Sequence, residues 1–112
     1  MNDAQQRIWS MGVTSLLEPF GFEAAGSCLS KTTQQVAQRI SLVPHSEVPS
    51  RFKVVLEVPE LSKQAELGML AKGKPHWWDT HTHSEKAIIA DVTTAVLEHG
   101  LSWFQSTVAG GS

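Results

Sequence analysis

The chain has 112 residues, which fit one domain and leave no room for a second hydrophobic core. Hydrophobic residues make up 41% and charged residues 18% of it, the balance of an ordinary globular protein. Nine Lys and Arg against eleven Asp and Glu give a net charge of -2, which argues against nucleic-acid binding that neutralises several phosphates at once. From the length we expect a single domain over residues 1–108, and from the small residues at the end a flexible tail over residues 109–112.

Cysteine usage and hydropathy bear on the compartment. Cys28 is the only cysteine, so the chain cannot form an internal disulfide. No apolar run approaches the length that crosses a bilayer, and the chain does not start with a Lys- or Arg-led apolar leader. These features predict a cytoplasmic protein without membrane association.

The first predicted element is an amphipathic helix. Asp3 and Gln6 have the spacing of a helix-capping pair, and the apolar residues after them recur every three or four positions. Pro19 and Gly21 are typical of the end of a helix. The sequence therefore predicts a helix of about four turns between these signals.

Three strands are predicted next. Residues 22–29 form a weakly patterned strand in which Gly26 predicts a bulge or a close approach of the backbone. Residues 36–42 alternate between apolar and polar side chains. Residues 52–58 alternate most strongly and stop at Pro59, so this strand is expected at the centre of the sheet.

The second half of the chain is less regular. Residues 60–75 have no clear period and are interpreted as a long loop with one or two helical turns. Residues 76–82 predict a fourth strand. Thr82 and Glu85 have the spacing of a capping box, and the helix after them is expected to end near Gly100, with an apolar segment that folds back on the sheet.

The order of these elements predicts an α+β fold. We expect an antiparallel meander of three to four strands flanked by an N-terminal and a C-terminal helix packed on one face. The other face of the sheet would then be open to a partner.

The densest group of chemically versatile side chains lies in residues 76–83. Asp79, His81 and His83 alternate, so an extended strand would point all three to one side. Two imidazoles and a carboxylate suit zinc, with a fourth position open for water. The pattern resembles the metal-binding entry of the PHP phosphoesterases and amidohydrolases, and it is similar to the start of the metallo-β-lactamase motif.

Two features weigh against such a zinc site. The families that it resembles take further ligands from later strands, for which too little chain follows His83. A cap at Thr82 would also place His83 in the first turn of the helix, away from the strand face. Exposed histidines at a strand-to-helix junction, with no cofactor, are therefore the preferred interpretation. A metal-dependent hydrolase with His76 or Glu85 as acid or base is the alternative.

Adjacent tryptophans suggest a binding surface. Trp77 and Trp78 would face opposite sides of a strand, so one is expected in the core and the other on the open face, where it either meets a partner or is covered by the long loop before it. Tryptophan is enriched among the residues that dominate protein interfaces. With the flanking His76 and His81, these residues form the predicted binding surface.

Three short apolar motifs also occur in order along the chain. They are Gly21 and Phe22, Trp77 and Trp78, then Gly100, Leu101, Trp103 and Phe104. On these motifs the chain resembles, over most of its length, a small bacterial family of domains of unknown function (4304-like). The resemblance implies a fold but no activity or cofactor that could be transferred.

The predicted function is that of a small intracellular module, not an enzyme, that binds another protein. The open sheet face and residues 60–78 would form the contact, and a bacterial immunity or defence-related interaction would suit such a domain. Homodimer formation through an exposed strand edge is an alternative. Single-stranded nucleic acid could stack on the tryptophans, but the sequence lacks the basic groove that this mode needs.

Overall fold

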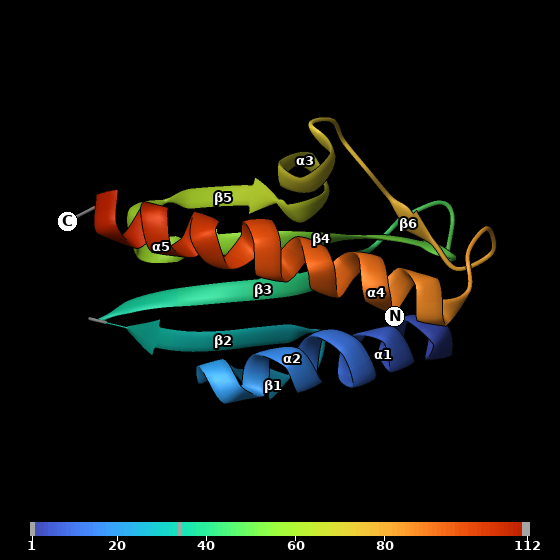
Figure 1. Cartoon of the computed structure of the whole chain (residues 1–112), viewed down its shortest axis with the longest axis horizontal. Coiled ribbons are helices and arrows are strands. Elements are labelled where there is room, and N and C mark those ends of the chain that lie inside the picture. Colours follow the sequence, from blue (N-terminus) through green and yellow to red (C-terminus); the bar gives the residue numbers. More distant parts are fainter. Residues whose placement is uncertain (1, 34, 111–112) are drawn as a thin grey trace.

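The computed structural model describes residues 2–33 and 35–110 and shows an α+β fold (Figure 1). A six-stranded antiparallel sheet is covered by helices on one face. The predicted fold class is confirmed, and the sheet is wider than the three to four strands expected. No helix in the described part of the chain is long and apolar enough to cross a membrane.

Five strands lie in the sheet in chain order, and each pairs antiparallel with the next. They are β1 (Glu23–Ala25), β2 (Cys28–Thr33), β3 (Val36–Pro44), β4 (Arg51–Val58) and β5 (Lys63–Glu66). β4 lies inside the sheet as predicted, because β3 pairs with one of its edges and β5 with the other. Its alternate side chains Phe52, Val54, Leu56 and Val58 are fully buried under the helices.

The first hairpin corrects the strand predicted over residues 22–29. Ala25 lies opposite Cys28, and Gly26 between them has a φ of 64°. Glycine adopts this left-handed conformation without the steric cost that other residues pay. The segment is therefore two strands joined by a tight turn, and Gly26 is a turn residue rather than a bulge.

One edge of β4 is shared by two short strands. β5 pairs with this edge from Val58 to Val55, and Glu66 lies opposite Val55. β6 (Trp78–Asp79) pairs with the same edge at Phe52 and Arg51, and Trp78 lies opposite Phe52. Between these pairs the chain leaves the sheet as the α3 segment (residues 67–77), which contains the helix α3 (Leu67–Lys72). The long loop predicted over residues 60–75 is thus largely ordered as a 3-10 turn η3 (Pro59–Leu61), β5 and α3.

The N-terminal helix is continuous but changes its winding. It comprises α1 (Asp3–Ile8), the π-helical η1 (Trp9–Thr14), α2 (Ser15–Leu17) and a 3-10 turn η2 (Glu18–Phe20). Gly21 follows in the left-handed conformation, as predicted for the end of this helix. The cap lies one residue earlier than predicted: Asn2 Oδ1 accepts the Gln5 N–H, and Gln5 Oε1 accepts the Asn2 N–H.

The C-terminal helix is longer than predicted. It comprises α4 (Glu85–Ala95), the π-helical η4 (Val96–Gly100) and α5 (Leu101–Gly110), so it does not end at Gly100. Gly100 is buried inside this helix, where it packs beside Leu67 of α3: a Cβ placed on it would lie 3.5 Å from Leu67 Cδ1, an ordinary contact distance. Ala109 is helical too and so differs from the flexible tail predicted over residues 109–112; residues 111–112 lie outside the described part of the chain.

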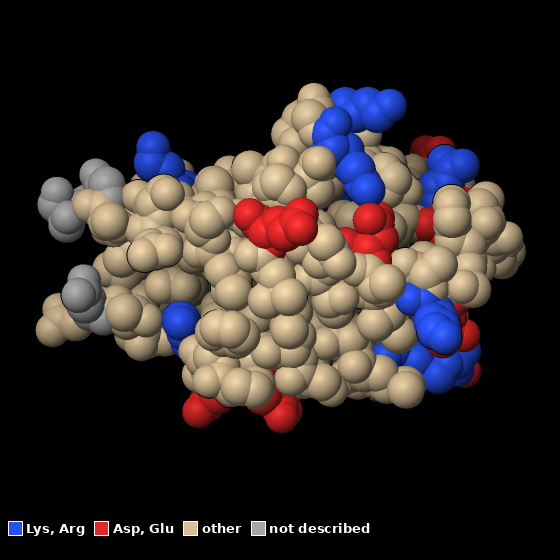
Figure 2. Space-filling view, in the orientation of Figure 1, with Lys and Arg blue, Asp and Glu red and all other residues tan. Residues whose placement is uncertain are grey.

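The two long helices lie side by side over the same face of the sheet (Figure 1). They approach closely at Gly12, where a Cβ would lie 3.1 Å from Ile89 Cγ2. Most of the helical layer carries few charges, whereas basic side chains gather beside α3 and around the first turns of α1 and α4 (Figure 2). This arrangement leaves the opposite face of the sheet without a covering helix among the described elements.

Candidate functional site

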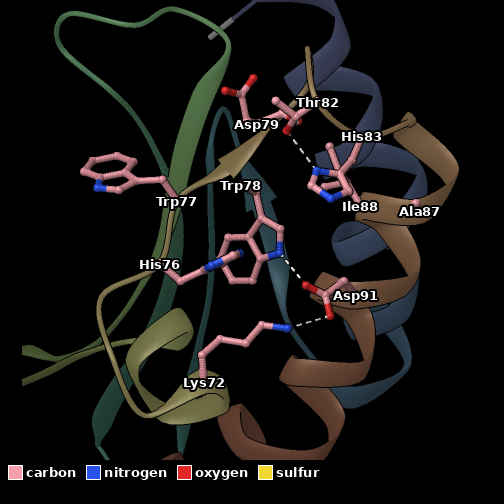
Figure 3. A pocket seen from close by; sticks show the side chains of 10 residues that line it. All are labelled: Lys72, His76, Trp77, Trp78, Asp79, Thr82, His83, Ala87, Ile88 and Asp91. Carbon is pink, nitrogen blue, oxygen red and sulfur yellow. Dashed lines mark hydrogen bonds and ion pairs between the residues drawn. The ribbon is translucent and has the colours of Figure 1, made fainter.

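The two tryptophans lie on opposite sides of the strand edge, as predicted. Trp78 pairs with Phe52 and shares its face, so its side chain enters the core, where it is 4% exposed. Trp77 points the other way and is half-buried (Figure 3). This short segment therefore contributes to both faces of the sheet.

Trp78 is held by three neighbours. Its ring stacks on Phe52, with centroids 5.9 Å apart and planes at 24°, and the His76 ring meets it edge-on at 4.9 Å. Its indole Nε1 donates a hydrogen bond of 2.8 Å to Asp91 Oδ2 on α4. Asp91 Oδ1 accepts a second hydrogen bond, of 3.0 Å, from Lys72 Nζ at the end of α3. This buried indole thus joins β6 to α4 and, through Asp91, to α3.

A pocket of about 260 Å³ opens beside Trp78, between β6, the end of α3 and the first turns of α4 (Figure 3). Its polar walls are Lys72, His76, Asp79, Thr82, His83 and Asp91, and its apolar walls are Trp77, Trp78, Ala87 and Ile88. A cavity of this size is at the small end of ligand-binding sites. It can hold a small organic molecule.

The pocket sets the protonation of two of its side chains. Burial lowers the pKa of His76 below its usual range, and the nearby charge of Lys72 lowers it further. Burial alone would raise the pKa of Asp91, but the hydrogen bonds from Trp78 and Lys72 outweigh it and lower that pKa. At neutral pH the pocket therefore contains a neutral imidazole and an ionised carboxylate.

Trp77 occupies a defined position on the open sheet face. The His45 ring meets it edge-on, with centroids 4.5 Å apart, and Lys53 Nζ lies 5.3 Å from the centre of its ring. His45 is itself fixed, because its Nδ1 accepts the N–H groups of Glu47 and Val48. The Trp77 ring is thus held in place, with part of its surface in solvent.

The rest of the open face carries charges of both signs. Arg39 on β3 lies opposite Glu57 on β4, and Lys53 Nζ lies 3.7 Å from Glu66 Oε1. Val55 lies between them and is buried. Because neighbouring charges offset each other, this face produces no strong field of either sign.

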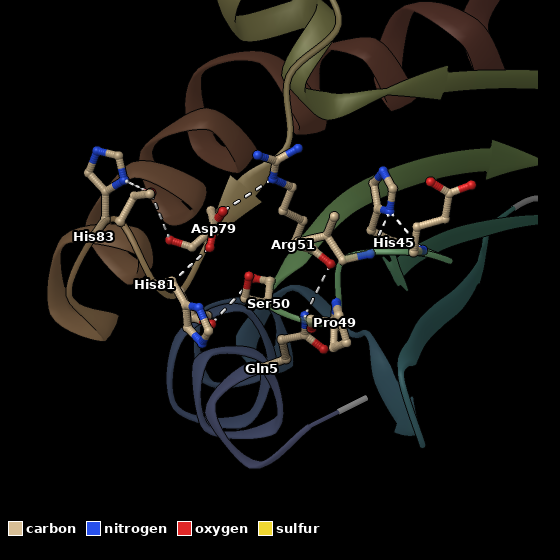
Figure 4. A network of polar contacts seen from close by, with 12 residues as sticks. Gln5, His45, Pro49, Ser50, Arg51, Asp79, His81 and His83 are labelled. Carbon is tan, nitrogen blue, oxygen red and sulfur yellow. Dashed lines mark hydrogen bonds and ion pairs between the residues drawn. The ribbon is translucent and has the colours of Figure 1, made fainter.

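Asp79 organises the turn after β6 (Figure 4). Its Oδ1 accepts the His81 N–H at 2.8 Å, and its Oδ2 accepts a hydrogen bond of 3.2 Å from Arg51 Nε. The His81 N–H is the main cause of a lowered Asp79 pKa, and Ser50 and Arg51 contribute. A side chain that bonds the backbone two residues further along is typical of an Asx turn.

This turn shortens the predicted fourth strand to Trp78–Asp79 and moves the cap of α4. Thr82 Oγ1 donates to the backbone oxygen of Asp79 at 3.3 Å, so it is engaged before the helix starts. Ser84 is the N-cap instead and accepts the Ala87 N–H at 3.1 Å. The predicted Thr82 cap is wrong, because the Asx turn carries the chain two residues further before it becomes helical.

The turn also separates the predicted zinc ligands. Asp79 bonds the backbone of His81 rather than approaching its ring, and His83 Nδ1 contacts Thr82 Oγ1 at 2.9 Å. Among residues 2–33 and 35–110, no three His, Cys, Asp or Glu side chains form a group that could hold a metal ion. Zinc binding stays a prediction that the geometry of this turn does not favour.

Three side chains near the site were not anticipated from the sequence. Lys72 and Asp91 frame the pocket, and Asp91 could have been noticed as the only charged residue in the apolar run from Ala87 to Leu97. Gln5 is fully buried and donates to the backbone oxygens of Pro49 and Arg51 (Figure 4). These bonds connect α1 to the loop between β3 and β4. In the sequence, only its place next to apolar helix residues could have indicated that Gln5 is buried.

Comparison with protein-family models, with curated proteins and with solved structures gives no match in any of the three. The resemblance to the 4304-like family therefore stays a prediction.

Proposed function

We propose that this domain binds another protein through the sheet face opposite the helices, with Trp77 at the centre of the contact. The observation that carries the proposal is the position of Trp77, which is half-buried on a sheet face that no described helix covers. The neighbouring contact residues would be His45 and Lys53, which touch the Trp77 ring.

A tryptophan in this setting is suited to a protein interface. It offers a large apolar area, and its ring is already positioned by His45 and Lys53, so binding would immobilise few side chains. Lys53 is also available to a partner carboxylate, since its bond to Glu66 is long and partly exposed to solvent. These features favour a contact in which Trp77 is the anchor and charged pairs form the rim.

The charge pattern favours a protein over a nucleic acid. Arg39 and Lys53 on this face are balanced by Glu57 and Glu66. A nucleic-acid surface needs a basic stripe that releases counterions from several phosphates. A protein partner with paired charges of its own suits this face better.

The test is comparative affinity capture with the whole chain as bait. We expect the wild-type chain and Trp103→Ala to retain a shared set of proteins that Trp77→Ala does not retain. Trp103 is the matched control, because it is the other half-buried tryptophan and lies on the helical side of the sheet. A partner that binds Trp77→Ala as tightly as wild type, measured with both purified proteins, would contradict the proposal.

Footprinting of the purified complex gives an independent readout. We expect the partner to protect Trp77 from oxidation and to leave the exposed Met11 and Met69 on the helical side reactive. The opposite pattern, with Met11 protected and Trp77 unchanged, would place the interface on the wrong face. If the partner is a second copy of the chain, the mass in solution will rise with concentration for wild type but not for Trp77→Ala.

Neither a role in bacterial immunity or defence nor zinc-dependent hydrolysis has a specific observation in its favour. The first concerns the identity of the partner, which only the captured protein can reveal. The second needs a group of ligands that Asp79, His81 and His83 do not form among the described residues. Both stay predictions from the sequence.

A further inference from the structure

We propose that the pocket between β6, α3 and α4 binds a small organic acid, with its carboxylate at Lys72 and His76 and its apolar body against Trp78 and Ile88. The site lies between Trp78 and α4, and of the residues in the protein contact proposed above only Trp77 also lines it (Figure 3).

The pocket has more donors to offer than acceptors. Lys72 Nζ has three N–H groups, of which the structure uses one, in the bond to Asp91. Among the described residues neither ring nitrogen of His76 has a hydrogen-bond partner, and the His83 ring makes one contact, through Nδ1 to Thr82. The Asp91 carboxylate already accepts hydrogen bonds on both oxygens, from Lys72 and Trp78. The pocket can therefore form more hydrogen bonds with a ligand that accepts them than with one that donates them.

The charges in the pocket point to the same class of ligand. Of the carboxylates that line it, Asp91 is paired with Lys72 and Asp79 is paired with Arg51. No carboxylate of the pocket is therefore left unpaired to repel an anionic ligand. A ligand carboxylate can accept the remaining N–H groups of Lys72 in a partly desolvated position, where a charge-assisted hydrogen bond is strong.

The apolar walls and the volume define the rest of the ligand. Ala87 and Ile88 on α4 face Trp78 across the pocket, so the body of the ligand would pack between a helix and an indole ring. A volume of about 260 Å³ suits a single ring or short aliphatic chain and excludes a dinucleotide. Benzoate is a suitable probe, because it combines one carboxylate with one flat apolar ring.

Binding should be linked to proton uptake at His76. Burial and the charge of Lys72 lower the pKa of this imidazole and keep it neutral. Asp91 acts in the opposite direction, and His83 and Lys74 lower the pKa a little further. A bound carboxylate favours the charged imidazole. Affinity for benzoate should therefore rise as the pH falls below about 6.5, the usual pKa of histidine, towards the lower pKa that His76 has without a bound anion.

The experiment is a titration of the full chain with benzoate at pH 6, followed by NMR. We expect saturable shifts of the His76 ring and of the Ala87 and Ile88 amides at millimolar benzoate, and proton uptake by calorimetry in two buffers. Benzylamine, which has the same ring and the opposite charge, should cause no saturable shift at these positions. Inorganic phosphate, which lacks the apolar body, should bind more weakly than benzoate.

Matched variants decide the assignment. Lys72→Met should weaken benzoate binding by about tenfold or more, because it removes a charged hydrogen-bond donor. Lys74→Met is the control and should bind as wild type, since Lys74 does not line the pocket. If Lys72→Met is poorly folded, His76→Gln serves instead and should abolish the proton uptake.

Three results would overturn the proposal. They are the absence of saturable shifts around the pocket, equal affinity of wild type and Lys72→Met, and binding of benzylamine as tight as that of benzoate. Lys53→Met separates this site from the protein contact, because Lys53 lies beside Trp77 on the open face and not in the pocket. It should leave benzoate binding unchanged, even if the proposed protein contact fails its own test.

Discussion

Trp77 and Trp78 are consecutive residues of the same type in contrasting surroundings. Trp78 is 4% exposed, stacks on Phe52 and donates to Asp91, whereas Trp77 is half-buried and touches His45 and Lys53 on the open face. The difference arises from strand geometry, since neighbouring residues on a strand face opposite sides. One side is needed for folding, and the other is available for recognition.

The largest effect is expected when the buried member of the pair is removed. Trp78→Ala empties a core position and leaves Asp91 without its indole donor, so we expect a loss of about 3–5 kcal/mol in the free energy of unfolding. Urea denaturation measures this loss. Trp78→Phe keeps most of the volume and should lose less, about 1.5–3 kcal/mol, the contribution of a hydrogen bond to a charged group. An equal loss in both variants would show that packing against Phe52 contributes little.

A second substitution tests how the Trp78 side is held. A Cβ on Gly68 would lie 2.8 Å from His76 Cβ and 3.0 Å from the His76 backbone oxygen, so Gly68→Ala must displace the chain just before the tryptophans. We expect a loss of about 1–3 kcal/mol, despite the higher helix propensity of alanine. Gly12→Ala is the control: its close neighbour is the Ile89 side chain, which can rotate, so its loss should be smaller.

Removal of the open-face member of the pair should change stability much less. Trp77→Ala loses an edge contact with His45 and the ring beneath Lys53, and we expect a cost of about 1 kcal/mol in chemical denaturation. Its near-UV spectrum should lose one indole signal without a change in the others. A cost as large as that of Trp78→Ala would remove the contrast between the two faces.

The smallest effect is expected at His76, and it depends on pH. Its folded pKa is lower than the unfolded value, so below about pH 6.5 the unfolded chain binds a proton that the folded chain does not. The stabilising contribution of the neutral imidazole is present above that pH and is lost as the pH falls towards the folded pKa. In unfolding curves at several pH values, His76→Gln should show a weaker decline over this window than wild type.

The fold class and the central strand were predictable because their signals are long. The alternation over residues 52–58 extends across a strand that is buried on one face, and the helices repeat their apolar residues over several turns. The opposite orientation of Trp77 and Trp78 followed from the same alternation. These predictions depended on periodicity alone, which a sequence displays directly.

The other features depend on short or distant contacts. β5 (Lys63–Glu66) lies at a sheet edge and shows no clear burial alternation, and β6 has only the two residues Trp78–Asp79, so neither produces a recognisable pattern. Thr82 and Ser84 are both plausible caps, and the choice is made by the bonds of Asp79 in the turn. The pocket needs Lys72 and Asp91 together, a pair that only the packing of α3 against α4 creates.

Because β5 and β6 pair with the same edge of β4, the segment between them can change in length. Glu66 and Trp78 pair with the same edge of β4, opposite Val55 and Phe52, so residues 67–77 leave the sheet and return to the edge that they left. The chain can therefore gain or lose residues near the exposed Gly73 without altering the register on either side. Homologues are expected to vary in length here first, and a grafted peptide at this position would be displayed beside both the pocket and Trp77.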